Sequence, residues 1–234
     1  MASFKNSSKM KALTFSFDDG VVQDIRMVEL LNKYGMKGTF NLNSEKLGKA
    51  RTMIMKNGQR ICHYKIAPQE VKDTYAGHEV AVHTLTHPHL YEMPDEELIR
   101  QVEEDRKNLE ALVGYDIEGM AYPFGDNDER IARVIRENTK IRYARVVKVT
   151  DDFDEQEDLL RFHSNAHMLK FDRLTELADR FLAMKPDKKQ IFCIWGHSYE
   201  MDIDSTYWYR FEEFLQKMAG HEDIYYGTNA EVLL

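Results

Sequence analysis

The sequence predicts an α/β fold in which about seven or eight mainly parallel strands form a barrel surrounded by helices. Short runs rich in apolar and aromatic residues alternate with helical patterns along the chain, which is typical of βαβ units. No repeat, low-complexity tract or linker interrupts this alternation. The 234 residues suffice for one buried core, and α/β barrels often run to roughly 200–250 residues. We therefore expect residues 1–234 to form a single domain, closed as a barrel.

The first half of the chain predicts three strands, at residues 11–17, 38–42 and 79–83. The helices predicted between them cover residues 22–34 and 68–75. The first helix has apolar residues at helical spacing and ends at Gly35, a residue that favours helix ends. Residues 44–65 carry no regular pattern and are expected to be an irregular surface excursion.

The second half predicts four further strands, at residues 119–122, 143–149, 190–195 and 224–227. Its helices are predicted at residues 94–113, 128–138, 174–184 and 207–219. The longest helix is entered through Pro94 and has three acidic residues in its first turn, where the helix dipole favours negative charge. The strand at 190–195 is almost entirely apolar and is expected to be buried.

Composition excludes several classes of partner and site. The net charge of −8 argues against nucleic acids and anionic membrane surfaces, which both require basic patches. Cys62 and Cys193 are far apart and indicate no disulfide framework. The polar first residues lack the apolar stretch of a secretory signal, and no run is long enough to span a bilayer. A cytoplasmic protein is expected.

Acidic and histidine side chains fall at the ends of the predicted strands. Asp18 and Asp19 follow the first strand, His83 ends the third, residues 122–125 (YPFG) end the fourth, and His197 follows the apolar strand. The strands of a parallel barrel all open on one face, where active sites are built. We therefore expect these side chains to converge on one cleft.

His83 and His87 are four residues apart, so one helical turn would point both imidazoles the same way. Two histidines and one carboxylate suit zinc and leave positions open for water and substrate, although other divalent ions also accept such ligands. Such a pair alone more often caps a helix or lies on a surface, acidic pairs are common in turns, and His197 alone could be a buried structural histidine. Their occurrence together at strand ends favours a metal site.

Four motifs resemble those of the polysaccharide deacetylases, the NodB-like carbohydrate esterases of family 4. Residues 16–20 (SFDDG) resemble that family's TFDDG motif. Residues 77–79 (GHE) and 83–87 (HTLTH) are similar to its GHE and H(S/T)xxH motifs. Residues 122–125 (YPFG) match the end of its RxP(Y/F)G motif, and His197 takes the place of the histidine in its LxH motif. These matches occur in family order and cover residues 14 to about 198.

This resemblance implies a distorted (β/α) barrel and hydrolysis of an N-acetyl or O-acetyl group of a carbohydrate. It implies a divalent metal, with zinc as the first expectation and cobalt, nickel, manganese or iron as others. The implied ligands are Asp19, His83 and His87. Asp18 would be the general base and His197 the general acid, and the backbone N–H of Phe124 would help to hold the oxyanion.

The sequence departs from the family pattern at three places. Ala121 stands where the family has an arginine that pairs with the catalytic aspartate, and we expect Arg161 to replace it, with Arg145 as second choice. The tryptophan-containing DxxDW motif has no clear counterpart. Trp195 replaces the leucine of the last motif and is expected to shape the acetyl pocket.

The same residues leave other functions open. The aromatic side chains of Tyr122, Phe124, Trp195 and Tyr199 are candidates for contacts with a sugar ring. A small linear or cyclic amide or imide is the alternative substrate, and a cytoplasmic location favours such a metabolite. A non-catalytic metal- or carbohydrate-binding relative is the third reading, favoured by the missing motif arginine. The presence of both Asp18 and His197 argues against it, because binding alone requires neither.

Overall fold

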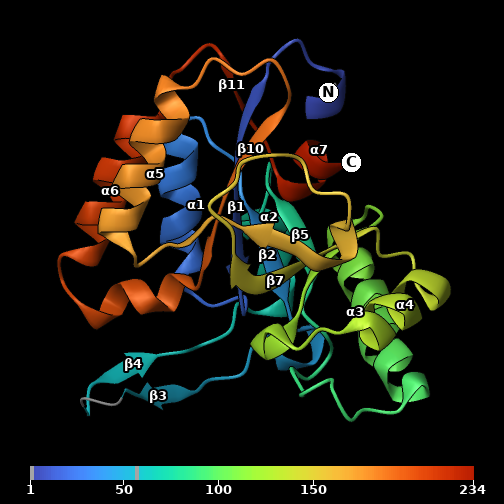
Figure 1. Cartoon of the computed structure of the whole chain (residues 1–234). Coiled ribbons are helices and arrows are strands. Elements are labelled where there is room, and N and C mark those ends of the chain that lie inside the picture. Colours follow the sequence, from blue (N-terminus) through green and yellow to red (C-terminus); the bar gives the residue numbers. More distant parts are fainter. Residues whose placement is uncertain (1–2, 56–57) are drawn as a thin grey trace.

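The computed structural model describes residues 3–55 and 58–234 and is built around one parallel sheet (Figure 1). Its strands are β1 (Lys11–Asp18), β2 (Thr39–Leu42), β5 (Glu79–Val82), β6 (Gly119–Ala121), β7 (Tyr143–Val149), β8 (Phe162–Ser164), β9 (Ala166–His167), β10 (Gln190–Gly196) and β11 (Ile224–Tyr226). The order across the sheet is β8-β7-β6-β5-β2-β1-β10-β9, with every pairing parallel. The predicted fold class, a mainly parallel α/β barrel, is confirmed.

The barrel closes irregularly between the first and last strands of this order. β8 and β9 are separated in the chain by Asn165 alone, so the two ends of the sheet meet. The backbone N–H of Asn165 donates to the carbonyl of Cys193 at 2.7 Å, and its side-chain oxygen accepts from the Cys193 N–H at 2.8 Å. Its side-chain amide donates to the carbonyls of Thr150 and Asp152, which follow β7. One buried residue therefore bridges the gap between the two ends of the sheet.

Helices cover the outside of the sheet. They are α1 (Asp24–Lys33), α2 (Val71–Thr74), α3 (Asp95–Val113), α4 (Glu129–Asn138), α5 (Phe171–Ala183), α6 (Tyr207–Met218) and α7 (Asn229–Leu233). Helices α1, α5 and α6 lie together on one side, and α3 and α4 lie on the other (Figure 1). None of the described helices is long and apolar enough to cross a membrane.

Alternation along the strands separates a packed outer face from a polar interior. Successive side chains of a strand point to opposite faces. In β1, Leu13, Phe15 and Phe17 belong to the main apolar core, whereas Ser16 and Asp18 bond to polar side chains of other strands. The interior of the barrel therefore carries polar residues toward the carboxyl ends of its strands, where the site lies.

The other end of the barrel is closed by an apolar cluster and one buried carboxylate. The cluster includes Phe4 near the N-terminus and Val232 and Leu233 of α7. Glu79 accepts hydrogen bonds from Thr39 Oγ1 at 2.8 Å, from the Tyr143 hydroxyl at 2.7 Å and from the Ala230 N–H at 2.9 Å. The glutamate of the GHE motif, on β5, thus connects β2, β7 and α7.

Residues 44–65 are more regular than expected. The segment begins with a short 3-10 helix, η2 (Ser44–Lys46), and contains an antiparallel pair, β3 (Thr52–Ile54) and β4 (Arg60–Cys62). The hairpin projects from the barrel beside the carboxyl end of the sheet (Figure 1). Residues 56–57 lie outside the described residues. The expectation of an irregular segment is wrong because each strand has only three residues, too few for a period to be recognised.

Candidate active site

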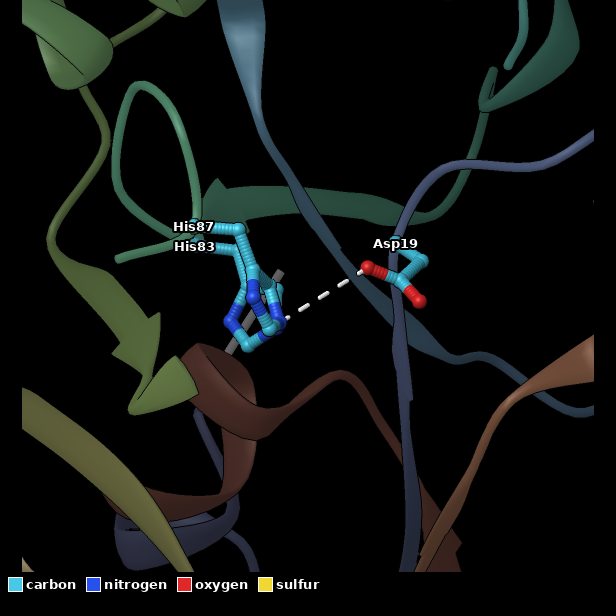
Figure 2. A group of neighbouring side chains, drawn as sticks. All are labelled: Asp19, His83 and His87. Atoms are coloured by element: carbon cyan, nitrogen blue, oxygen red, sulfur yellow. Dashed lines mark ion pairs between the residues drawn. The ribbon is translucent and has the colours of Figure 1, made fainter. Parts of the chain in front are cut away.

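Three predicted metal ligands come together at the carboxyl ends of the strands. The ligand atoms of Asp19, His83 and His87 all lie within 4.8 Å of one another. Both imidazoles face the Asp19 carboxylate (Figure 2), and His87 Nε2 lies 4.0 Å from Asp19 Oδ1. Asp19 directly follows β1 and His83 directly follows β5.

A tight loop, and not a helical turn, brings the two histidines together. The helical expectation for residues 83–87 is wrong, because Thr84 and His87 adopt positive φ angles of 65° and 58°. The His87 N–H donates to Thr84 Oγ1 at 3.2 Å, and the Asn43 amide donates to the carbonyls of both His83 and Thr84. The rings still meet, with their centroids 4.8 Å apart.

Backbone strain is concentrated in the loops that follow β1, β5 and β6. The non-glycine residues with positive φ in the described chain are Asp19, Thr84, His87 and Phe124. Each such conformation costs of order 1–3 kcal/mol and persists where the surroundings enforce it, commonly at functional sites. Gly20 also has a positive φ of 63°, and a Cβ there would lie 2.6 Å from a methyl group of Leu42. The glycine of the SFDDG motif is therefore required by both conformation and space.

The donor set fits a divalent cation. His83 Nδ1 donates to the carbonyl of Ala121 at 2.8 Å, which leaves Nε2 for an ion. Burial lowers the pKa of His83, and burial together with the charge of His83 lowers the pKa of His87 to about 3. Both imidazoles are therefore neutral at pH 7, as metal ligands must be. Burial would raise the pKa of Asp19, but its partners hold it well below the usual value, so this carboxylate is ionised.

Those partners of Asp19 are two residues that sequence reasoning did not assign to the site. His63 Nε2 lies 3.1 Å from Asp19 Oδ2, and Lys65 Nζ lies 3.3 Å from Asp19 Oδ1. His63 is buried against the ring of Tyr199. A carboxylate has about four lone-pair positions, so these contacts leave room for an ion. The segment carrying His63 and Lys65 has no motif that would have revealed them.

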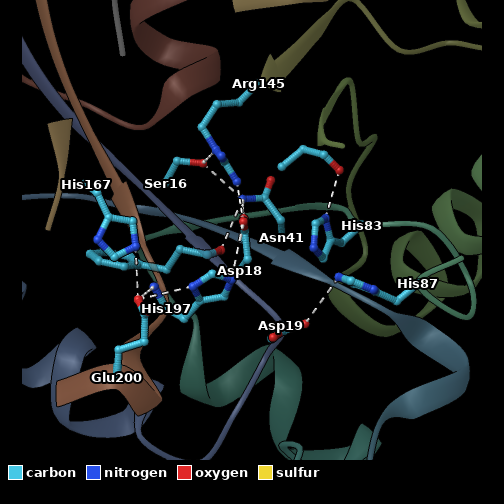
Figure 3. A network of polar contacts seen from close by, with 12 residues as sticks. Ser16, Asp18, Asp19, Asn41, His83, His87, Arg145, His167, His197 and Glu200 are labelled. Atoms are coloured by element: carbon cyan, nitrogen blue, oxygen red, sulfur yellow. Dashed lines mark hydrogen bonds and ion pairs between the residues drawn. The ribbon is translucent and has the colours of Figure 1, made fainter. Parts of the chain in front are cut away.

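Asp18 points into the barrel interior and is held by a second set of partners (Figure 3). Its Oδ2 forms an ion pair with the guanidinium of Arg145, which is fully buried. Its Oδ1 accepts a hydrogen bond from Asn41 at 2.9 Å, and Ser16 accepts one from Arg145 Nε at 3.0 Å. Burial alone would raise the pKa of Asp18, but Arg145, His83 and His197 hold it below the usual value.

Arg145, and not Arg161, supplies the charge that Ala121 lacks. Arg161 pairs with Asp158 at 2.6 Å and Glu129 at 2.9 Å at the surface, so the first expectation is wrong. Arg145 lies on β7 directly across from Ala121 on β6. An arginine on the neighbouring strand therefore reaches Asp18, the aspartate with which an arginine at position 121 would pair. Arg161 precedes β8 and lies outside the barrel interior.

Replacing Arg145 by alanine is expected to lower the free energy of unfolding by about 3–5 kcal/mol at pH 7, because it leaves the Asp18 charge buried and unpaired. Arg161→Ala is the matched control and should cost only about 0–1 kcal/mol, since its ion pairs are exposed. The ion pair stabilises the folded state fully at pH values above the unfolded-state pKa of aspartate, about 3.9. This contribution is lost as the pH falls through the lowered pKa of Asp18 in the folded state. Urea unfolding at pH 7 and pH 3.5 should therefore give a smaller Arg145→Ala effect at the lower pH. Equal effects of the two variants at pH 7 would contradict the assignment.

His197 is oriented by a carboxylate three residues away. His197 follows β10 and its Nδ1 lies 3.2 Å from Oε2 of Glu200, which belongs to the 3-10 helix η6 (Ser198–Ile203). Its Nε2 lies 4.0 Å from Asp18 Oδ2. Burial would lower the pKa of His197, but Glu200 outweighs it and raises the pKa to about 9. His197 is therefore protonated at neutral pH.

Glu200 also bonds to His167 of β9, and the three side chains could in principle hold an ion. The same oxygen, Oε2, lies 3.1 Å from His167 Nε2 and 3.2 Å from His197 Nδ1. The two imidazoles hold the pKa of Glu200 at about 2. This cluster serves hydrogen bonding, because the ligating oxygen is shared between two N–H donors and His197 carries a proton.

The predicted aromatic residues differ in what they offer a substrate. Tyr122 is 1% exposed and its hydroxyl donates to the carbonyl of Leu160 at 2.8 Å, so the expectation that it stacks on a sugar is wrong. Phe124 is 55% exposed and its ring lies on His89 with centroids 3.9 Å apart. Trp195 is half-buried between Arg145 and His167. Phe124 is therefore the predicted aromatic residue with a free surface.

These side chains border one cleft of about 1180 Å³. Its walls include the predicted residues Asp18, Asp19, His83, His87, Tyr122, Phe124, Trp195 and His197. Tyr199, Val147, Ala50 and Met53 add to the apolar part of the lining. Four separate strand ends therefore converge on one cleft, as predicted.

Several solved structures share this fold. The chain resembles a family 4 carbohydrate esterase from Streptomyces lividans in complex with acetate (TM-score 0.57, 14% identity, 93% of this chain and 91% of that one). It also resembles the esterase domain of a multidomain xylanase from the hindgut metagenome of Trinervitermes trinervoides (TM-score 0.57, 16% identity, 94% and 89%). A third is a family 4 pseudoenzyme from Bacillus anthracis (TM-score 0.54, 16% identity, 96% and 66%). At these identities the likeness shows the fold.

The sequence itself settles the family. A search of curated protein sequences finds no match. The family model described as "Polysaccharide deacetylase" matches residues 5–143, more than half of the chain. The match contains the strand ends that carry Asp18, Asp19, His83 and His87. The chain belongs to the polysaccharide deacetylase family, hydrolases of esters and of carbon–nitrogen bonds other than peptide bonds.

Proposed function

We propose that the protein is a metal-dependent deacetylase that hydrolyses an N-acetyl or O-acetyl group of a carbohydrate. One observation carries this proposal. Asp18 and His197, each with its own charged partner, border the same cleft as the Asp19, His83 and His87 cluster. A proton acceptor, a proton donor and a cation site within one cleft are the groups that acyl hydrolysis requires.

Asp19, His83 and His87 would hold the ion. With two neutral imidazoles and one carboxylate, zinc suits the set best, and cobalt, nickel, manganese or iron are further candidates. When bound, a divalent ion would lower the pKa of a water toward about 7 and polarise the acyl oxygen. His63 and the Ala121 carbonyl hold Asp19 and His83 in orientation, as outer partners of metal ligands do.

The remaining residues divide the proton transfers. Asp18 is ionised and accepts the proton of the attacking water. His197 is protonated and donates to the departing amine or alcohol, which leaves poorly as an anion. The backbone N–H of Phe124, in the strained turn after β6, would add a donor for the oxyanion. Trp195 and Val147 would border the acetyl methyl group.

The charge arrangement also bears on the non-catalytic alternative. That alternative rested on the missing motif arginine, and one structural relative is described as a pseudoenzyme. Arg145 pairs with Asp18 in place of that arginine. Sugar or metal binding alone would not require a buried arginine–aspartate pair beside a protonated histidine, so catalysis is the better-supported proposal.

Substrate profiling tests the proposal. The metal-loaded protein should release acetate from N-acetylated oligosaccharides, such as those of chitin, or from O-acetylated sugars. A panel of linear amides and cyclic imides is the comparison, with ring opening followed by ultraviolet absorbance. Ring opening without acetate release would reject the deacetylase and favour the small-amide hydrolase.

Replacing Glu200 by glutamine should move the pH profile of acetate release. Glu200 raises the pKa of His197, so its neutral replacement lowers that pKa and His197 loses its proton at lower pH. The alkaline limb of kcat/KM is expected to shift to lower pH, while metal content stays unchanged. Glu200→Asp keeps the negative charge, so its pH profile should lie closer to that of the unaltered protein. A uniform loss of rate at every pH would instead indicate that Glu200 only supports the local fold.

A further inference from the structure

The cleft carries a positive charge surplus in an acidic protein. Its lining contains two aspartates, Asp18 and Asp19, and four lysine and arginine side chains. Those four are Lys46, Lys49, Arg51 and Lys65. Counting only these aspartate, lysine and arginine side chains, the lining has two positive charges in excess, whereas the whole chain carries −8.

Three of these cations have no acidic partner. Lys65 is held by Asp19. Within residues 3–55 and 58–234, no carboxylate lies within 4.0 Å of the charged nitrogens of Lys46, Lys49 or Arg51, although the chain has 40 acidic residues. Burial and then the charge of Lys65 lower the pKa of Lys46, and Arg51 and Lys49 add to this effect, whereas Asp19 opposes it. The cations therefore repel one another. Such a group of like charges is stabilised when an anion binds among them.

The three cations come from one short stretch of chain. Lys46 ends η2, and Lys49 and Arg51 lead into β3. The apolar lining residues Val147 and Trp195 come from β7 and β10. The acyl group of a substrate would therefore contact β7 and β10, and an anionic group on the same substrate would contact the stretch that carries the three cations. The arginine fork and the lysine ammonium groups are the donors that bind carboxylate and phosphate oxygens.

We propose that the substrate carries a carboxylate or phosphate group, which Lys46, Lys49 and Arg51 bind while the acetyl group lies at Asp18 and His197. This inference rests on the proposed deacetylase function and narrows its substrate to an acidic sugar derivative. Lys49 and Arg51 are exposed, so both can meet a ligand from solvent.

Three probes that differ mainly in charge test the inference. They are N-acetylglucosamine, which is neutral, N-acetylmuramic acid, which carries a carboxylate, and N-acetylglucosamine 6-phosphate. Calorimetry should use protein stripped of metal and then freed of the chelator, so that neither contributes. At least one anionic probe should bind about tenfold more tightly than the neutral sugar. The anionic probe that binds more tightly shows whether the site prefers a carboxylate or a phosphate.

The double variant Lys49→Gln/Arg51→Gln should lose this preference. The matched control is Lys72→Gln/Arg133→Gln, which makes the same charge change at exposed positions on α2 and α4 and should keep it. Equal binding of all three sugars by the unaltered protein would overturn the inference, as would equal losses in both double variants.

Acetate release from the same sugars is measured in parallel with the metal-loaded protein. A binding preference without acetate release would reject the deacetylase function and leave the anion site standing, whereas equal kcat/KM for charged and neutral sugars would reject the anion site alone.

Discussion

Asp18→Asn is expected to lower kcat for acetate release by about 10²–10⁴-fold and to leave metal binding unchanged. Asp18 faces Arg145 and Asn41 in the barrel interior and is not among the ligand atoms that cluster with the histidines. An asparagine keeps the size of the side chain but cannot accept the proton of the attacking water. The measurement is kcat together with metal content on the same preparation.

The neighbouring variant, Asp19→Asn, distinguishes the two roles. Asp19 would lie beside a dication, where it stays ionised and cannot easily accept a proton. Its replacement should therefore weaken metal affinity first, and excess metal should partly restore the rate. Asp18→Asn should remain slow at any metal concentration. Restoration of Asp18→Asn by excess metal would mean that the two roles are reversed.

His83→Ala and His87→Ala are each expected to abolish stoichiometric metal binding, because each removes one of three ligands. The matched control is His89→Ala, since His89 lies in the same loop region but pairs with Asp126 at 2.9 Å. Metal content after gel filtration should fall from about one ion per chain toward none in the first two variants and stay unchanged in the control.

Stability offers a second measurement that does not depend on activity. A ligand at about 100 times its Kd stabilises the native state by about 2.7 kcal/mol. Added zinc should therefore raise the unfolding midpoint of the unaltered protein and of His89→Ala, but not that of His83→Ala or His87→Ala. Zinc stabilisation that persists in a folded His83→Ala/His87→Ala protein would place the ion elsewhere.

Much of the fold could be predicted because the barrel follows local patterns. The strands of the main sheet up to β7, and β10, are long or apolar enough to be recognised, and the predicted boundaries differ from the observed ones by only a few residues. β8 and β9 were not assigned, since they have three and two residues and are held by Asn165. The last helix, α7, was also missed, although Thr228 and Glu231 form a capping box that signals its start.

The site was predictable where its residues follow strands. Asp18, Asp19, His83 and His197 could be brought together because parallel strands end on one face. Arg145 was placed second because pairing across strands β6 and β7 is a tertiary fact that sequence order does not contain. The pattern of β7 would have favoured it, since Arg145 shares one face of the strand with Tyr143, which bonds to Glu79, and with Val147, which lines the cleft.

Partners supplied by loops were the least predictable. His63 and Lys65 reach Asp19 from the hairpin segment, and no spacing in the sequence connects them to it. Glu200 had a detectable signal, because it lies at the third position of the helix that His197 caps. Its role beside His197 nevertheless became clear only from the shared oxygen between His197 and His167.

In the proposed deacetylase, one ion, Asp18 and His197 act together in a single hydrolytic site. Titration of the stripped protein with zinc, with acetate release followed at each step, tests it most directly. We expect no acetate release without metal and a rise that breaks sharply at one equivalent per chain. We also expect Asp18→Asn to bind the same single equivalent without gaining activity. Acetate release that is independent of metal, or a break at two equivalents, would contradict a single-ion site.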